Sequence, residues 1–244
     1  VFADKGWGTI YLGNHDQPRM VSRWGNDSPE FHEASSKLLT TFILSMRATP
    51  YYYAGDELGM SNIKFDNIKD YRDIETLNYY KKLQAENGDL DYFLKGQKLS
   101  ARDNGRTPFQ WDATTQAGFT TGKPWLKINP NYKKINAAEQ EKDPDSILNY
   151  FRKMVKLRKA MPELVYGAYA LLAENNKQVY AYTRSLDDKK VLIVMNFSDN
   201  EAGFNLPKSM GKIGEVLINN VSGYKIKDGK FNLTPWQAII VRID

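Results

Sequence analysis

The sequence predicts an α/β region built around a parallel sheet, followed by a smaller antiparallel β domain. The order predicted over residues 9–57 is strand, polar loop, helix, strand and polar loop, which is the repeating unit of such a fold. After Pro162 the sequence changes to short strand-like runs separated by turn residues. Between these parts lies a long polar stretch, 59–144, rich in Gly, Asn, Pro and aromatic residues. A compact domain seldom contains so much irregular chain unless that chain builds a site.

The first strand is predicted over residues 9–13, a β-branched and aromatic run that ends in a polar cluster. Its carboxyl end places Asn14, His15 and Asp16 in a loop. A helix is predicted over residues 32–47, because apolar side chains recur there every three to five positions and would form one buried stripe.

A second strand is predicted over residues 49–54, and one helix is predicted near 73–86 inside the long polar stretch. Asp143 and Pro144 are suited to begin a further helix, as its N-cap and its first helical residue, and this helix is predicted to end near residue 160.

The last 80 or so residues are predicted to form an antiparallel β domain with tight turns at Asn175–Asn176 and Asp187–Asp188. Domain limits of 1–162 and 163–244 follow from this change of pattern. The best defined strands are predicted over residues 178–184, 190–197 and 237–243.

Composition argues against several classes of function. Lys and Arg give a net charge of +5 but are intermixed with Asp and Glu, and base-reading motifs are missing, so no nucleic-acid partner is expected. The absence of cysteine excludes disulfides, thiolate zinc sites and a cysteine nucleophile, while leaving the redox compartment open. No apolar run approaches the roughly 20 residues of a membrane helix, and residues 1–5 do not resemble a signal peptide. With only two histidines and no ligand-like spacing, no metal site is expected.

Several ordered segments together resemble one family. The chain is similar to the α-amylase superfamily, glycoside hydrolase family thirteen, and most of all to its oligo-1,6-glucosidases. A single His-Asp pair would be weak support, whereas ordered matches over almost the whole chain are specific. The segments that carry the resemblance are Asn14 to Arg19, Tyr71 to Tyr80, Ala101 to Asp112, Ala117 to Gly122 and Asn129 to Tyr132, followed by Asp145 to Ile147.

This resemblance implies the C-terminal portion of a (β/α)8 TIM barrel, about its last two βα units, followed by an antiparallel β-sandwich domain. A complete barrel takes about 250 residues, so residues 1–162 would hold only the last part of one. In the family, the nucleophilic Asp and the acid/base Glu precede the His-Asp motif. The chain alone is therefore expected to be inactive, as part of a retaining α-glucosidase that acts on terminal, mainly α-1,6, bonds of short oligosaccharides.

The resemblance also implies roles for three residues. Asp16 matches the transition-state stabiliser, and His15 matches a residue that binds the same sugar ring. The physical case for Asp16 is that hydrogen bonds to sugar hydroxyls that tighten in the oxocarbenium-like transition state contribute several kcal/mol. Arg106 matches an arginine that reaches the non-reducing glucose, and its guanidinium fork suits vicinal hydroxyls or a carboxylate.

A purely structural interpretation of these residues remains open. Asp16 could cap a loop or pair with Arg19, His15 could be a satisfied buried histidine, and Arg106 could form only a loop salt bridge. Arg102 and Asp103 are interpreted as holding that loop together.

Two further groups of residues, one acidic and one aromatic, are alternative site candidates. Asp56 or Glu57 could pair with Asp16 as a two-carboxylate glycosidase, but the family uses neither in that way. The aromatic residues that could stack on sugars are more often core residues, and we expect most of them to pack. These are Tyr51, Tyr52, Tyr53, Phe109 and Trp111.

Other relatives keep the specificity open, including trehalose-6-phosphate hydrolases, sucrose isomerases, trehalose synthases and dextran glucosidases. The alternative function is a non-catalytic carbohydrate-binding or structural module derived from the same fold. The expected partners are an oligosaccharide substrate and either the missing N-terminal part of the same polypeptide or a second copy of the chain, with no membrane and no organic cofactor. The compartment is left open, and the resemblance favours the cytoplasm.

Overall fold

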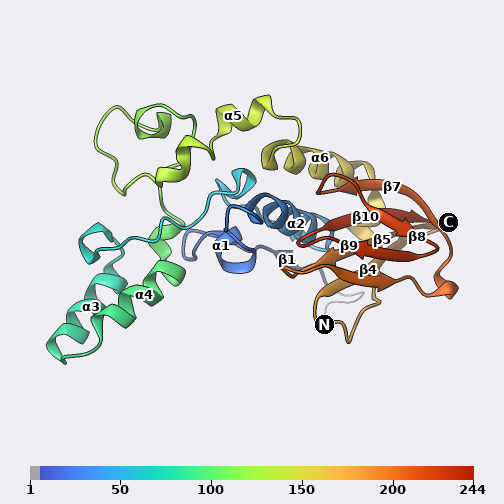
Figure 1. Ribbon diagram of the computed structural model, residues 1–244, viewed down its shortest axis with the longest axis horizontal. Helices are drawn as coiled ribbons and strands as arrows, with labels where there is room; N and C mark the ends of the chain where they lie inside the picture. The colour runs from blue at the N-terminus through green and yellow to red at the C-terminus, as the bar shows by residue number, and fades with distance from the viewer. Residues whose placement is uncertain (1–5) are drawn as a thin grey trace. The chain divides into compact units, whose positions relative to one another are not determined.

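The structure, a computed structural model, describes residues 6–244, which fall into two compact units (Figure 1). The first, here called the β unit, comprises residues 6–10, 28–51 and 150–244. The second, here called the loop unit, comprises residues 11–27 and 52–149. Residues 1–5, the segment compared above with a signal peptide, lie outside the described residues.

The β unit contains the predicted parallel strand pair. Strand β1 (Thr9–Ile10) pairs in parallel with β2 (Thr49–Pro50), so the order predicted over residues 9–57 is confirmed, although both strands are shorter than expected. Parallel strands require a crossover connection, and this one contains helix α2 (His32–Ser45). Within the described residues, β1 and β2 pair only with each other.

Helix α2 is buried on more than the single apolar stripe that its sequence predicts. Leu38, Leu39 and Ile43 are buried as expected, but so are small hydroxyl residues on the other side. Thr41 Oγ1 lies 2.7 Å from the Tyr150 hydroxyl and donates to a carbonyl of its own helix. The single-stripe prediction is wrong because a second layer covers the polar side, and hydroxyls that bond back to the helix tolerate that burial.

Two antiparallel sheets complete the β unit, as predicted. The five-stranded sheet has the order β3-β4-β5-β10-β7, and the three-stranded sheet has the order β6-β9-β8. The two-residue turn at Asp187–Asp188 joins β4 to β5 as expected. The strands are β3 (Ala168–Leu171), β4 (Val179–Leu186), β5 (Lys189–Asn196), β6 (Ala202–Asn205), β7 (Ile213–Asn219), β8 (Lys225–Lys227), β9 (Lys230–Leu233) and β10 (Ala238–Ile243).

Alternate residues of the central strands face opposite sides of the five-stranded sheet. Leu192 and Val194 of β5 belong to an apolar core shared with Phe231 of the smaller sheet, whereas Ile193 and Met195 are buried on the other side. Helix α2 approaches that second face, where Ser45 Oγ lies 2.5 Å from the Tyr182 hydroxyl. The β unit therefore has three layers: small sheet, large sheet and helix.

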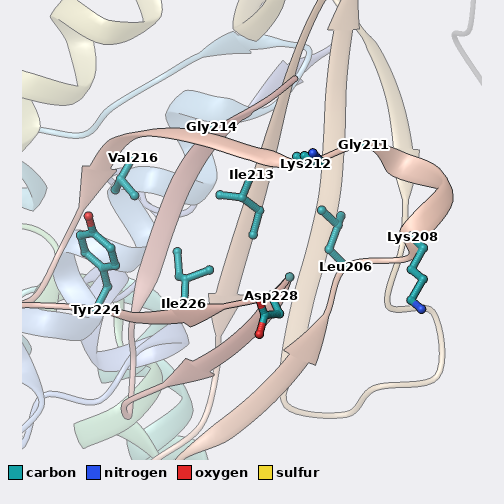
Figure 2. Close-up of a pocket in the computed structure, with 11 residues that line it drawn as sticks. Leu206, Lys208, Gly211, Lys212, Ile213, Gly214, Val216, Tyr224, Ile226 and Asp228 are labelled. Atoms are coloured by element: carbon teal, nitrogen blue, oxygen red, sulfur yellow. The ribbon is translucent and has the colours of Figure 1, made fainter.

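The two sheets leave an opening at one side, because edge strands β7 and β8 are not paired with each other. A cavity of about 610 Å³ lies there. Figure 2 shows Ile213 and Ile226 pointing toward each other from these strands, with Tyr224 and Asp228 at the rim.

Helices α6 (Ile147–Ala160) and α7 (Pro162–Tyr166) precede the first strand of the sandwich. The prediction that Asp143 and Pro144 begin α6 is wrong. Asp143 instead follows α5 (Ala137–Lys142) and accepts the Asp145 N–H, while the Ser146 hydroxyl accepts the Asn149 N–H at the start of α6. A serine cap three residues before its donor is the stronger start signal.

The loop unit contains more helix than the sequence predicts. The expected helix near 73–86 is α3 (Ile74–Ala85), and it forms a hairpin with an unpredicted helix, α4 (Leu90–Ser100) (Figure 1). The short helices α1 (Met20–Trp24) and α5 were not predicted either.

Buried amide side chains satisfy much of the irregular backbone of the loop unit. Asn62 accepts the Arg19 N–H and donates to the carbonyls of residues 98 and 99. Gln140 donates to the Leu58 carbonyl and accepts the Leu148 N–H. Because buried backbone groups must find partners, these side chains replace the ladders of regular structure.

None of the helices in residues 6–244 has the length and apolar character needed to cross a bilayer.

Candidate active site

The predicted site lies entirely within the loop unit and begins with a turn at Asn14. The Asn14 side-chain oxygen accepts the Asp16 N–H at 2.8 Å, and its carbonyl accepts the Gln17 N–H at 3.2 Å. Asparagine favours such turns because its short side chain mimics a backbone acceptor. Asn14 thereby fixes the backbone that carries His15 and Asp16.

The guanidinium group of Arg106 binds both the main chain and a side chain of this turn. Its Nε donates to the His15 carbonyl at 2.7 Å, and its Nη2 donates to Asp16 Oδ1 at 3.0 Å. The preceding residue, Gly105, explains how the segment comes so close. A Cβ at Gly105 would lie 2.4 Å from the Gln17 carbonyl oxygen, so a side chain cannot fit without a backbone shift.

Arg102 joins the same cluster, in addition to holding its loop against the start of α3. Its Nη1 lies 3.7 Å from Asp16 Oδ1, and its Nη2 lies 2.7 Å from Asp73 Oδ1 and 2.8 Å from Glu75 Oε2. Arg106 also approaches Asp73, at 3.4 Å. Two guanidinium groups are therefore shared between Asp16 and Asp73.

Asp73 is the buried anchor of this cluster, and its role was not predicted. It caps α3, since its Oδ2 accepts both the N–H and the hydroxyl of Thr76 at 3.0 and 2.9 Å. Burial alone would raise the pKa of Asp73, but the hydrogen bonds from Thr76 and the charge of Arg102 outweigh it and lower that pKa. A carboxylate that stays ionised holds both arginines in place.

Asp103 holds the loop together, as its sequence context suggested. Its fully buried carboxylate accepts the backbone N–H groups of Arg72 and Asp73 at 2.6 and 2.8 Å. Its second oxygen lies 3.7 Å from Arg106 Nη1. The start of α3 is thus tied to the segment that carries the two arginines.

His15 and Asp16 face open space. Their side chains are 73% and 52% exposed, and His15 Nε2 lies 3.3 Å from Asp16 Oδ2. His15 is therefore not a buried histidine, and Asp16 pairs with Arg106 and Arg102 instead of Arg19. Oδ1 of Asp16 accepts from Arg106, whereas Oδ2 faces the exposed imidazole. The catalytic and binding roles themselves stay predictions.

Arg19 has a separate structural function. It is buried, donates to the Ala54 carbonyl at 2.7 Å and lies over the Tyr53 ring. Asp56 lies near it, and burial raises the pKa of Asp56 to about 7 even though the charge of Arg19 opposes this.

Asp16 borders two cavities of the loop unit. One, of about 620 Å³, extends along the α3–α4 hairpin, and the other, of about 520 Å³, extends past Gln17 and Arg23 of the α1 region. Neither Asp56 nor Glu57 is among the described residues that line them, so a pairing of either one with Asp16 receives no support.

None of the five candidate stacking aromatics is fully buried, although Phe109 packs against the apolar cluster of Leu58, Met60 and Leu148. Tyr51 and Trp111 are exposed, and the other three are only partly buried. Trp111 packs on Phe109 with ring centroids 4.5 Å apart. Their segments lie at the surface of their units, where loop packing relies on buried amides. Within residues 6–244, no cluster of three or more His, Cys, Asp or Glu side chains could hold a metal ion.

Solved structures similar to this chain include isomaltulose synthases and a trehalulose synthase. Isomaltulose synthase from Klebsiella sp. LX3 matches with a TM-score of 0.93 at 44% identity, over 98% of this chain and 43% of that chain. A mutant isomaltulose synthase from Erwinia rhapontici NX5, in complex with its natural substrate sucrose, matches with a TM-score of 0.94 at 43% identity, over 99% and 44%.

Among curated proteins, oligo-1,6-glucosidase of Parageobacillus thermoglucosidasius is 44% identical over 98% of this chain and 43% of its own length. Trehalose-6-phosphate hydrolase of Bacillus subtilis is 39% identical over 100% of this chain and 44% of its own length. The chain thus spans less than half the length of these relatives. Residues 179–240 match the alpha-amylase SusG C-terminal domain, and residues 1–167 match the alpha-amylase catalytic domain. Because the match to the alpha-amylase catalytic domain covers more than half of the chain, the chain belongs to the alpha-amylase family.

Proposed function

We propose that this chain is the C-terminal part of a retaining α-glucosidase that hydrolyses terminal α-1,6 bonds of short oligosaccharides. The observation that carries the proposal is the ion-pair cluster at Asp16. Arg106 and Arg102 hold one carboxylate oxygen, the other lies 3.3 Å from the exposed imidazole of His15, and Asp16 borders two cavities. The linkage follows the names of the relatives, several of which are oligo-1,6-glucosidases.

Asp16 would act on the sugar through Oδ2, because Oδ1 is already occupied by Arg106. A fixed carboxylate that binds a hydroxyl of the reacting ring contributes most when that hydrogen bond tightens in the oxocarbenium-like transition state. Retaining chemistry also requires a nucleophilic carboxylate and an acid/base carboxylic acid about 5 Å apart. Both would come from a part of the parent protein that this chain does not contain.

His15 and Arg106 would bind the same terminal glucose. In the structure the Arg106 nitrogens contact the His15 carbonyl, Asp16 and Asp73, so its first effect is to orient Asp16. We infer that a terminal glucose adds hydroxyl contacts at the same guanidinium edge. Arg106→Lys, which keeps the charge but loses the planar fork, would then raise KM.

The same proposal assigns residues 1–162 to the last part of a (β/α)8 barrel and 163–244 to the C-terminal sandwich. The parallel β1–β2 pair supports this assignment, because two short parallel strands need further strands to form a stable sheet. We propose that the unpaired edges associate with the N-terminal part of the parent or with a second copy of the chain. A monomer in light scattering at high protein concentration would contradict such association.

Activity can be tested in a chimera that joins the N-terminal part of the Parageobacillus oligo-1,6-glucosidase to this whole chain. The chimera should hydrolyse p-nitrophenyl α-glucoside and prefer isomaltose to maltose. Asp16→Asn should lower kcat by about 100- to 1,000-fold, as expected for loss of one preorganised transition-state contact. A chimera that folds and binds glucosides but turns over none, with or without Asp16, would instead favour a non-catalytic binding module.

A further inference from the structure

The cavity along the α3–α4 hairpin is lined by Asp16 and also by Tyr79, an aromatic residue to which the proposed function assigns no role. Its lining includes Asp16, Glu75 and Arg102, and also Tyr79 of α3 and Phe93 of α4. Glu75 and Tyr79 are four residues apart, so they lie on the same face of α3, one turn from each other. One turn is about 5.4 Å, which is comparable to the length of a hexose ring.

The Tyr79 ring packs against Phe93 and lines the cavity. Its centroid lies 5.4 Å from that of Phe93, with the two rings inclined at 39°. Half of Tyr79 is nevertheless exposed. An aromatic ring that is fixed by a neighbour and retains an open surface offers apolar contact at little cost in conformational entropy.

The charges of the cavity favour a neutral ligand. Asp16, Asp73 and Glu75 line it together with Arg102, and Arg106 pairs with Asp16 and Asp73, so three carboxylates stand against two guanidinium groups. These carboxylates would repel a phosphate but can accept hydrogen bonds from sugar hydroxyls.

We propose that Tyr79 is the platform for a second sugar unit of a neutral oligosaccharide, beyond the terminal glucose at Asp16. This inference rests on the proposed function, because an enzyme that removes terminal glucose must direct every other unit of the substrate away from Asp16. The hairpin cavity provides that path, and Tyr79 lies one helical turn beyond the Glu75–Arg102 pair.

The test is an NMR titration of the whole chain with methyl α-glucoside, isomaltotriose and trehalose 6-phosphate. Tyr79→Ala should weaken isomaltotriose binding about 3- to 10-fold, the range expected for loss of one aromatic contact, and leave methyl α-glucoside unchanged. Alanine is well tolerated in a helix, so α3 should persist. Tyr79→Trp should retain the wild-type preference for isomaltotriose.

The matched control is Tyr92→Ala, because Tyr92 is a 78% exposed tyrosine of the same hairpin that is not among the described residues lining the cavity. It should change neither affinity. Equal losses for Tyr92→Ala and Tyr79→Ala, an equal loss for both neutral sugars, or tighter binding of trehalose 6-phosphate than of isomaltotriose would overturn the inference. So would a chain that binds neither neutral sugar. The proposed function is judged separately, by turnover of the chimera and its dependence on Asp16.

Discussion

In the β unit the buried side chains are mainly apolar, whereas in the loop unit buried polar side chains outnumber the apolar ones among the described residues. The β unit encloses one continuous apolar core between its sheets. Among the described residues of the loop unit there are two small apolar clusters, and its other buried side chains include several amides and carboxylates. Apolar contacts are not directional, but hydrogen bonds are, and a unit that must place Asp16 and two arginines benefits from directional contacts.

Buried cations show the same contrast. In the β unit, Arg184 donates only to carbonyls, including those of Ser45 at the end of α2 and Leu164 in α7, and burial lowers its pKa to about 10. Helix C-termini offer unpaired carbonyls and partial negative charge. In the loop unit, the partly buried Arg102 and Arg106 bind the carboxylates of Asp16 and Asp73, although the buried Arg19 donates to carbonyls as Arg184 does. One unit uses buried charge to join helix ends, and the other uses it to shape a site.

The largest expected effect is on the apolar core. Phe231 is 1% exposed and packs 5.8 Å, centroid to centroid, from Phe204. Phe231→Ala should lower the free energy of unfolding by about 3–5 kcal/mol, through lost burial and the cavity left behind. Denaturant unfolding measures the change, and hydrogen exchange should show lost protection in residues 168–243. Phe119→Ala, in an exposed position of the loop unit, is the control and should change stability by less than about 0.5 kcal/mol.

Most of the fold was predictable from local patterns. Hydrophobic periodicity located α2 and the central strands of the sandwich, because their apolar residues are deeply buried. Helix α4 was not predicted: none of its residues is buried, and Gly96 in its interior is unfavourable to a helix. Its N-cap was visible, since the Asp89 side chain accepts the Tyr92 N–H, and Asn136 caps α5 in the same way.

The site was predictable only in part. Resemblance identified Asp16, His15 and Arg106, and the structure brings all three together. Asp73 was inside a quoted motif, but its role depends on the convergence of Arg102 and Arg106, about 30 residues further along the chain. Local pattern carries no information on such contacts. The available signal for this role was the position of Asp73. It directly follows Arg72, stands at the start of a predicted helix, and lies in a segment expected to build a site.

The second effect is a pH dependence confined to the loop unit. Burial raises the pKa of Asp56 to about 7 from an ordinary value of 3.8, with Arg19 opposing and Glu57 reinforcing that rise. The folded state therefore binds this proton more tightly than the unfolded state between about pH 4 and pH 7. Stability contributed by this group is present below that window and declines as the pH rises through it, by up to about 4 kcal/mol.

Asp56→Asn should abolish this slope and leave a protein more stable than wild type above about pH 7. Unfolding free energies of both proteins from pH 4.5 to pH 8 give the difference curve, which isolates Asp56 from the opposite trend of Asp73. The exposed Asp91→Asn is the control and should leave the slope unchanged. A difference curve that is flat, or that rises with pH for wild type, would show that Asp56 is not buried in a raised-pKa environment.

The smallest effect tests whether amides of the loop unit replace regular structure. Asn62 is 5% exposed and makes three hydrogen bonds to backbone, one from Arg19 at 2.9 Å and two to residues 98 and 99. Asn62→Ala leaves those groups buried without partners and should lower the unfolding free energy by about 1–3 kcal/mol. The exposed Asn205→Ala in β6 should have little effect. Because Asn62 fixes the backbone of Arg19, the last residue of the motif that begins at Asn14, hydrogen exchange should accelerate in residues 14–24 and 96–106 together. Acceleration in only one of these segments would mean that the amide fills space without coupling them, and that the loop unit is organised by its small apolar clusters after all.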